Sequence, residues 1–261
     1  MKIHVLGICG TYMAGVAQLA RALGHDVAGS DVSFRPPMSD VLKDQDIQCF
    51  EGYDIANVLD AELVIVGNVM SRGHEILESI IDKKIPYISA PAWMAANVLA
   101  DRWVIAIAGT HGKTTTTAMV IHILQSAGLE PGYLIGGKMN SQVGTAQLGK
   151  NPYFVIEADE YDSAFYDKRP KFMHYFPRTL IINNIEFDHA DIYRSIEDIK
   201  FQFSQLLRTV PSDGCIVAPS DDMHIDEVIS VGCWSSVERF GGYETSLQAI
   251  HTVADGSSCS V

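Results

Sequence analysis

The sequence predicts an α/β fold made of two consecutive parallel-sheet units. Short apolar runs alternate with helical patterns from the second residue onward, which is typical of parallel sheets with crossover helices. The alternation begins again at Trp103, where a second glycine loop follows a second apolar run. We therefore expect a Rossmann-like parallel sheet in residues 1–100 and a P-loop-type α/β unit in residues 101–261.

Each expected element rests on an apolar run or on helical periodicity. In the first unit, strands are expected at 2–7, 25–31, 61–67 and 85–90, with a helix over 13–24. In the second unit, apolar runs that stop at acidic or amide residues predict strands within 152–160, 179–189 and 214–222. Apolar residues at helical spacing predict a helix over 195–210.

Composition narrows the class of protein. Hydrophobic residues make up 47% of the 261 residues, so a folded globular protein is expected. A formal net charge of −13 disfavours nucleic acid and anionic membranes as partners, but not small phosphorylated ligands. No apolar run reaches the roughly 20 residues of a membrane helix, and the start does not read as a secretory signal. The five cysteines are scattered, without a C-x-x-C pair, which argues against a zinc site and favours a reducing cytoplasm.

The segment "AGTHGKTTTT" predicts a phosphate-binding loop. It follows an apolar strand and opens a helix near Lys113, so its backbone N–H groups and the helix dipole can hold phosphates. Lys113 would neutralise β/γ-phosphate oxygens, and the Thr114 hydroxyl would bind Mg²⁺. The usual first glycine of such loops is replaced by Ile107. The alternative is a glycine turn beside a surface lysine.

Two other expected strands end in side chains that can bind a metal. "YFVIEADEYD" supplies Glu157, Asp159 and Glu160, and "TLIINNIEFDH" supplies Asn183, Asn184, Asp188 and His189. Because ligands collect beyond the carboxyl ends of parallel strands, these groups are expected near the phosphate loop. Glu157 directly ends its apolar run and is the first candidate. A solvated acidic loop and a structural histidine are the alternatives.

The N-terminal segment "LGICGTYMAG" has glycines at 7, 10 and 15. The dinucleotide pattern G-x-G-x-x-G fails in it, because Cys9 and Tyr12 stand where glycines are required. A nucleotide with a diphosphate can still approach the helix start, with Asp31 at the end of the second strand as a ribose partner. A structural tight turn is the alternative. An NAD-dependent oxidoreductase is disfavoured.

The motifs "GICGTYMAG", "GSD", "AGTHGKTTTT", "EADEYD" and "NNIEFDHAD", in this order, resemble the Mur ligase family, whose phosphate loop also lacks the first glycine. The resemblance implies ATP and Mg²⁺. It implies catalytic roles for Lys113, Glu157 and His189, with Mg²⁺ held by Thr114, Glu157 and His189. The ATP-binding residues implied are Gly109, Thr110, His111, Gly112, Lys113, Thr114 and Thr115. Those implied for a UDP-linked substrate are Gly7, Ile8, Cys9, Gly10, Thr11, Tyr12, Met13, Gly15 and Asp31.

Two branches of this family share the GTHGKTTTT loop. One joins L-alanine to UDP-N-acetylmuramate, and the other joins the recycled tripeptide L-alanyl-γ-D-glutamyl-meso-diaminopimelate through an acyl phosphate. The "EADEYDSAFYDKRPKF" segment resembles the tripeptide branch, in peptidoglycan recycling. In it, Lys168 and Arg169 either face the substrate or lie in a solvated loop. Members of the family carry a third, C-terminal domain that is not expected within these 261 residues, so a nucleotide-binding fragment without turnover is a further hypothesis.

Overall fold

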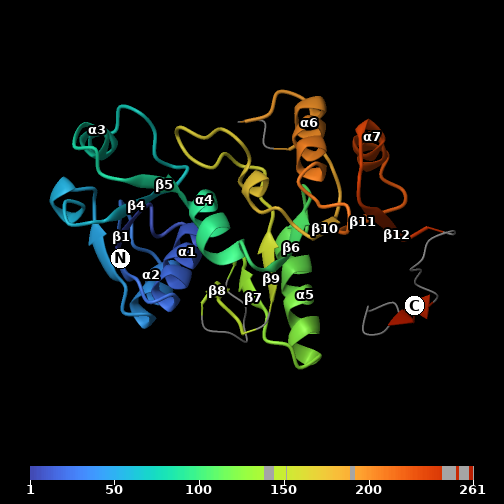
Figure 1. Ribbon diagram of the computed structural model, residues 1–261, viewed down its shortest axis with the longest axis horizontal. Coiled ribbons are helices and arrows are strands. Elements are labelled where there is room, and N and C mark those ends of the chain that lie inside the picture. The colour runs from blue at the N-terminus through green and yellow to red at the C-terminus, as the bar shows by residue number, and fades with distance from the viewer. Residues whose placement is uncertain (138–143, 151, 189–191, 243–250, 253–258, 261) are drawn as a thin grey trace.

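Two sheets lie side by side along the long axis of the molecule in the computed structural model (Figure 1). The structure describes residues 1–137, 144–150, 152–188, 192–242, 251–252 and 259–260. Helix α4 (Ala90–Met94) and the helical turn Ala95–Leu99 lead from the last strand of the first sheet to the first strand of the second.

The first sheet is fully parallel, in the order β3-β2-β1-β4-β5. Its strands are β1 (Lys2–Leu6), β2 (Asp26–Asp31), β3 (Gln48–Glu51), β4 (Leu63–Val66) and β5 (Tyr87–Ser89). The accompanying helices are α1 (Thr11–Ala22), α2 (Met38–Asp44) and α3 (Glu75–Asp82). The outward order on either side of β1 is that of a Rossmann-like sheet, which confirms the predicted fold class.

The second sheet has the order β12-β11-β10-β6-β9-β7-β8, and all of its pairs are parallel except β7 with β8. Its strands are β6 (Trp103–Ala108), β7 (Gly132–Leu134), β8 (Ala146–Gln147), β9 (Tyr153–Glu157), β10 (Thr179–Ile182), β11 (Cys215–Pro219) and β12 (Ser236–Phe240). The helices are α5 (Lys113–Ser126), α6 (Ile196–Leu207) and α7 (Met223–Val231). A short antiparallel pair joins β13 (His251–Thr252) to β14 (Cys259–Ser260).

Helix α1 packs against both sheets and brings the two units into one continuous hydrophobic core. A Cβ at Gly15 would lie 3.2 Å from Leu134 of β7 and 3.4 Å from Ala146 of β8, so a side chain there would push the second sheet away. One turn later, the Gln18 amide donates to the Thr145 hydroxyl at 3.1 Å, and both residues are buried. The small residues of α1 therefore set the distance between the units.

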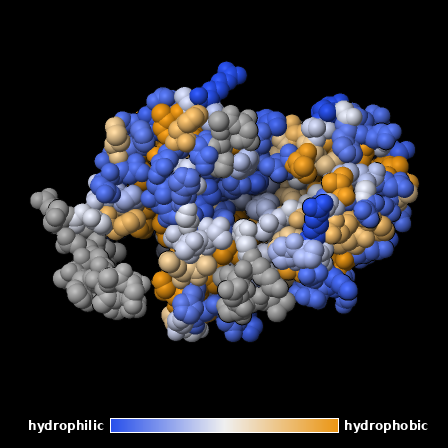
Figure 2. Space-filling model, turned by 180° about the vertical axis from the view of Figure 1, so that it is seen from behind, coloured by the Kyte–Doolittle hydropathy of each residue, from blue (hydrophilic) through white to orange (hydrophobic). Residues whose placement is uncertain are grey.

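The outer surface is mainly hydrophilic on the face shown in Figure 2, where hydrophobic residues form small patches. This agrees with the strongly negative net charge. Among the described residues, none of the helices combines the length and the apolar character that crossing a bilayer requires.

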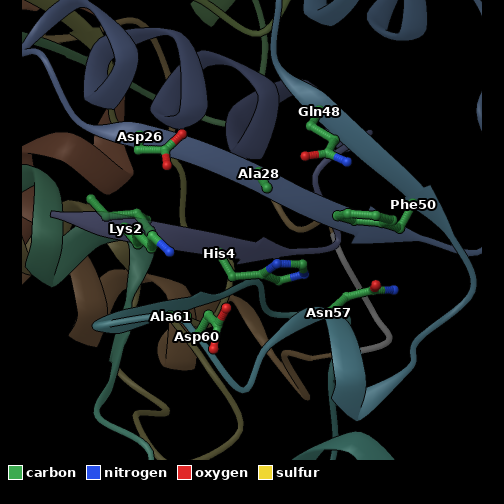
Figure 3. A pocket seen from close by; sticks show the side chains of 10 residues that line it. Lys2, His4, Asp26, Ala28, Gln48, Phe50, Asn57, Asp60 and Ala61 are labelled. Carbon is green, nitrogen blue, oxygen red and sulfur yellow. The ribbon is translucent and has the colours of Figure 1, made fainter.

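A small cavity of about 170 Å³ lies on the first sheet, next to a buried histidine (Figure 3). His4 of β1 is 2% exposed, and its Nε2 lies 2.8 Å from the Ser30 hydroxyl. The ring also stacks near Phe50 of β3, with centroids 6.2 Å apart. Burial disfavours the charged imidazolium and lowers the pKa of His4 to about 4. His4 is therefore a neutral core residue at pH 7.

We predict that His4 makes the fold sensitive to mild acid. Its pKa of about 4 lies below the ordinary 6.5, so as the pH falls the unfolded chain is protonated first, and stability is lost between pH 6.5 and 4. His4→Asn, which does not titrate, should reduce the loss of unfolding free energy between pH 7.5 and 5 by about 2 kcal/mol. Urea unfolding at both pH values measures this loss. His122→Asn on the exposed side of α5 is the control, and an equal acid response of both variants contradicts the prediction.

Candidate functional site

The predicted phosphate loop connects β6, at the centre of the second sheet, with the start of α5. Gly109 and Gly112 have φ values of +129° and +78°, which L side chains rarely adopt. Gly112 is the residue before the helix and provides no side-chain cap, so the first N–H groups of α5 are open to an anion. Ile107 is buried within β6 and pairs with Glu157 and Ile181, which explains why this loop has no glycine there.

Two amides that follow β10 brace this loop from the neighbouring strand. The Asn184 side-chain oxygen accepts from the His111 N–H at 2.9 Å, and the Asn183 amide donates to the His111 carbonyl at 3.2 Å. The Thr110 hydroxyl accepts from the Glu186 N–H at 2.9 Å. The sequence placed Asn183 and Asn184 at this edge as metal candidates. The structure gives them a role in shaping the loop.

Lys113 forms a buried ion pair with Glu160. Its Nζ lies 2.9 and 3.1 Å from the two Glu160 oxygens, and it also donates to the Gly109 carbonyl at 2.7 Å. Glu160 is only 3% exposed. An isolated buried carboxylate is costly, so Glu160 holds the ammonium of Lys113 over the loop. Sequence reasoning ranked Glu160 below Glu157 and did not foresee this pair.

Glu157 and Thr114 form the second contact between β9 and the loop. The Thr114 hydroxyl donates to Glu157 Oε2 at 3.2 Å, and the Gly136 N–H donates to Oε1 at 2.7 Å. Burial raises the pKa of Glu157, although these two hydrogen bonds and the Lys113 charge act in the opposite direction. A desolvated carboxylate beside a hydroxyl is a donor set that suits Mg²⁺, which binds few protein oxygens and keeps water or phosphate ligands.

The structure does not bring the other predicted metal ligands that it describes into contact with Thr114 and Glu157. The Asp159 carboxylate pairs with the Lys171 ammonium at 2.6 Å, and not with Thr114. Asp188 is half-buried beyond β10, and His189 lies outside the described residues. Within the described part of the chain, no three histidine, cysteine or acidic side chains converge as a metal site. Of the residues predicted as ligands, Thr114 and Glu157 are brought into direct contact.

The N-terminal glycine loop is closed by Asp31. Its carboxylate accepts from the Cys9 N–H at 2.8 Å and from the Val32 N–H at 2.7 Å. Gly7 has a φ of +77°, and Gly10 stands directly before α1 without a side-chain cap. Burial, together with the nearby Asp31 charge, raises the pKa of the Cys9 thiol to about 12, so this cysteine stays protonated at pH 7.

A cavity of about 200 Å³ lies at the start of α1, and both units line it. The first unit supplies Gly10 to Met13, Asn68, Ala90 and Pro91, and the second supplies Ser163 and Lys171. Of the predicted UDP-binding residues, Gly10, Thr11, Tyr12 and Met13 thus share one cavity. Ile8 and Gly15 are buried in the core, and Gly15 faces Leu134 instead of this cavity.

Two family models match the sequence of this chain, one in each of its two units. The Mur ligase family catalytic domain matches residues 2–102, and the Mur ligase middle domain matches residues 107–258. The chain belongs to the Mur ligase family. The predicted membership is therefore confirmed.

The chain is more similar to one kind of ligase in this family than to another. A UDP-N-acetylmuramate–L-alanyl-γ-D-glutamyl-meso-2,6-diaminoheptandioate ligase of Escherichia coli is 52% identical over 92% of this chain and 53% of that protein. A UDP-N-acetylmuramate–L-alanine ligase of Clostridium tetani is 31% identical over 99% of this chain and 55% of that protein. The crystal structure of the tripeptide ligase of Neisseria meningitides matches with a TM-score of 0.93 at 45% identity, covering 98% of this chain and 82% of that one. The chain spans about half the length of the curated relatives that it matches.

We predict that Gly109→Ala destabilises the protein and distorts the loop. A Cβ at Gly109 would lie 3.1 Å from Asn183 and from the Asn184 backbone, in addition to the unfavourable φ. The expected loss of unfolding free energy is about 1–3 kcal/mol. Gly128→Ala is the matched control, because Gly128 also has a positive φ but its Cβ would meet nothing within 4 Å. Urea unfolding should show the larger loss for Gly109→Ala. Equal losses would show that Asn183 and Asn184 exert no steric constraint on Gly109.

Proposed function

We propose that this chain forms the substrate- and ATP-binding part of an ATP-dependent ligase. The reaction joins the tripeptide L-alanyl-γ-D-glutamyl-meso-diaminopimelate to UDP-N-acetylmuramate, in peptidoglycan recycling. The observation that carries the proposal is the difference in identity, 52% to the ligase named for the tripeptide and 31% to the one named for L-alanine. The use of ATP and a UDP-linked substrate assigns the reaction to the cytoplasm.

The proposed ATP site is the loop from Gly109 to Gly112 with the first turn of α5. The open N–H groups at the helix start and the positive end of its dipole favour phosphate oxygens. Lys113 is already held beside the loop by Glu160, so its charge can neutralise the transferred phosphate with little rearrangement. In this proposal, the exposed hydroxyl groups of Thr114 and Thr115, in the first turn of α5, face the opening of the ATP site.

Thr114 and Glu157 are the residues proposed to hold Mg²⁺, with His189 as a further ligand. Bound Mg²⁺ would screen the charges of the phosphates and of the attacking carboxylate. The raised pKa of Glu157 reflects the cost of burying its charge, which the two hydrogen bonds and the nearby Lys113 charge offset only in part. A divalent ion bound there would favour the ionised carboxylate.

The proposed UDP-linked substrate occupies the cavity at the start of α1, so that residues 1–100 bind the sugar nucleotide and residues 101–261 bind ATP. Asp31 keeps the Cys9 segment closed over the end of β2. Because the cavity is lined by both units, a substrate in it would extend from the glycine loop towards the acidic segment after β9.

In the proposed reaction, the carboxylate of the UDP-linked substrate attacks the terminal phosphate of ATP, the bond from that phosphorus to the β-phosphate oxygen breaks, and an acyl phosphate and ADP are formed. The tripeptide amine then attacks the acyl carbon, an amide bond forms, and phosphate leaves. Both substrates of the first step are anions, so Lys113 and the α5 amides lower the barrier by charge stabilisation and by holding the reactants together.

We predict that Lys113→Met abolishes ATP binding. The substitution removes the charge from the loop and leaves the side-chain volume similar. Isothermal titration with ATP and Mg²⁺ measures the affinity. Lys150→Met is the matched control, because Lys150 also forms a carboxylate pair, with Glu130 at 2.8 Å, but is 81% exposed and far from the loop in sequence.

Unchanged ATP affinity of Lys113→Met contradicts the assigned role of the loop. Because Glu160 is left buried without its partner in this variant, the double variant Lys113→Met with Glu160→Gln is measured beside it. Loss of binding in a folded double variant supports the assignment.

We predict that phosphate release depends on the tripeptide. With ATP, Mg²⁺ and UDP-N-acetylmuramate present, the tripeptide should stimulate release at least tenfold more than L-alanine does. The assay uses the full product of the reading frame, because the relatives named for these reactions are about twice as long. Equal stimulation by L-alanine would instead support the L-alanine ligase. Binding of ATP with Mg²⁺ to the 261 residues alone, without turnover, would support a nucleotide-binding fragment.

A further inference from the structure

Lys171 is a buried lysine at the junction between the two units. It begins a 3₁₀ turn (Lys171–His174) and is 8% exposed. Its Nζ donates to Asp159 at 2.6 Å and lies over the rings of Tyr12, at 5.3 Å, and Tyr161, at 5.7 Å. Tyr12 belongs to α1 in the first unit, so the ammonium bridges the two units.

The wall of the cavity at the start of α1 includes the ammonium of Lys171, whose partner Asp159 is not among the lining residues. Lys171 is the charged side chain among the described residues that line it, and no carboxylate is among them. The first N–H groups of α1 point to the same end of the helix, which has neither a side-chain cap nor an acidic residue in its first turn. The chemistry of this cavity therefore suits an anionic oxygen.

Packing alone gives no reason for a lysine at this position. A buried ion pair seldom stabilises a protein more than an apolar pair of similar volume, because both charges lose water. Of the three N–H donors of Lys171, one is bonded to Asp159, and the ammonium lies over the rings of Tyr12 and Tyr161. Among the described residues, no second acceptor of its hydrogen bonds is recorded, and a ligand in the cavity can supply one.

We propose that Lys171 binds an anionic oxygen of the UDP-linked substrate, and that its ion pair with Asp159 positions the ammonium for this contact. The proposal rests on the proposed function. The shared chemistry is a negatively charged oxygen, which the substrate offers both in its diphosphate and in its lactyl carboxylate. Lys168 and Arg169, which precede it, pair with Asp162 and Asp167 at the surface and are 68% and 63% exposed, so they do not share this position.

The test is the binding of three ligands without ATP, measured by isothermal titration on the 261-residue chain. UDP carries only the diphosphate, UDP-N-acetylglucosamine adds the sugar, and UDP-N-acetylmuramate adds the carboxylate. Lys171→Met should weaken UDP-N-acetylmuramate binding at least tenfold, the range expected for a lost charged hydrogen bond. Lys168→Met, in the same loop, should stay within twofold of the unmodified protein, and Lys171→Arg should recover part of the loss.

The three ligands locate the contact. An equal loss for all three assigns Lys171 to the diphosphate, and a loss confined to UDP-N-acetylmuramate assigns it to the carboxylate. Affinities of Lys171→Met within twofold of the unmodified protein for all three ligands overturn the proposal. Failure of the unmodified chain to bind any of them overturns the proposed function itself and this inference with it.

Lys171→Met leaves Asp159 without its partner, so folding is checked by circular dichroism. If that variant does not fold, Lys171→Met with Asp159→Asn replaces it, because the double variant has no unpaired buried charge. The proposal is overturned if the folded double variant binds the ligands as tightly as the unmodified protein does. It is supported if the double variant loses tenfold in affinity and Lys168→Met does not. Binding of ATP with Mg²⁺ to the same variant should be unchanged, which separates this site from the loop at Lys113.

Discussion

The ion pair between Lys113 and Glu160 is the contact on which the second unit's site depends. It ties the loop before α5 to the segment after β9, across the middle of a parallel sheet. Since Glu160 is almost fully buried, breaking one side of the pair would leave an uncompensated charge, at a cost of about 3–5 kcal/mol. The acidic segment is thereby held under the loop. Within this segment, Glu157 contacts Thr114 of the loop, and Asp159 contacts Lys171.

The position of α1 is the second constraint, and it decides where the two units meet. Gly15 lets β7 and β8 approach the helix, and the Gln18–Thr145 hydrogen bond fixes this approach with two buried polar groups. At the other end of α1, Tyr12 and Tyr175 bring their hydroxyl groups to 3.1 Å. The cavity at the start of α1 is lined by residues of both units. A ligand that fills it is therefore sensitive to how the units are packed.

Much of this arrangement was predictable from the sequence, because it follows from strand order. Parallel strands present their carboxyl ends at one edge, so an apolar run ending at Glu157 had to place this residue near the loop after Ala108. The sequence did not distinguish Glu160 from Asp159, because the path of the irregular segment after β9 decides which carboxylate is buried under Lys113. The strands β7 and β8 have three and two residues, too few for a periodic pattern to be visible.

The contact between Lys171 and the Tyr12 ring could not be predicted from the sequence, because the two residues belong to separate units and meet only where α1 packs against the second unit. Yet both lysines of the two proposed sites show the same arrangement. The side chains are 14% and 10% exposed, each is held by a carboxylate of the segment after β9, and each lies at the start of a helix whose first N–H groups are uncapped. A ligand anion at either helix start meets a lysine already in place. Because the two carboxylate partners, Asp159 and Glu160, are adjacent residues, one short segment after β9 holds both cations in place, each at its own site.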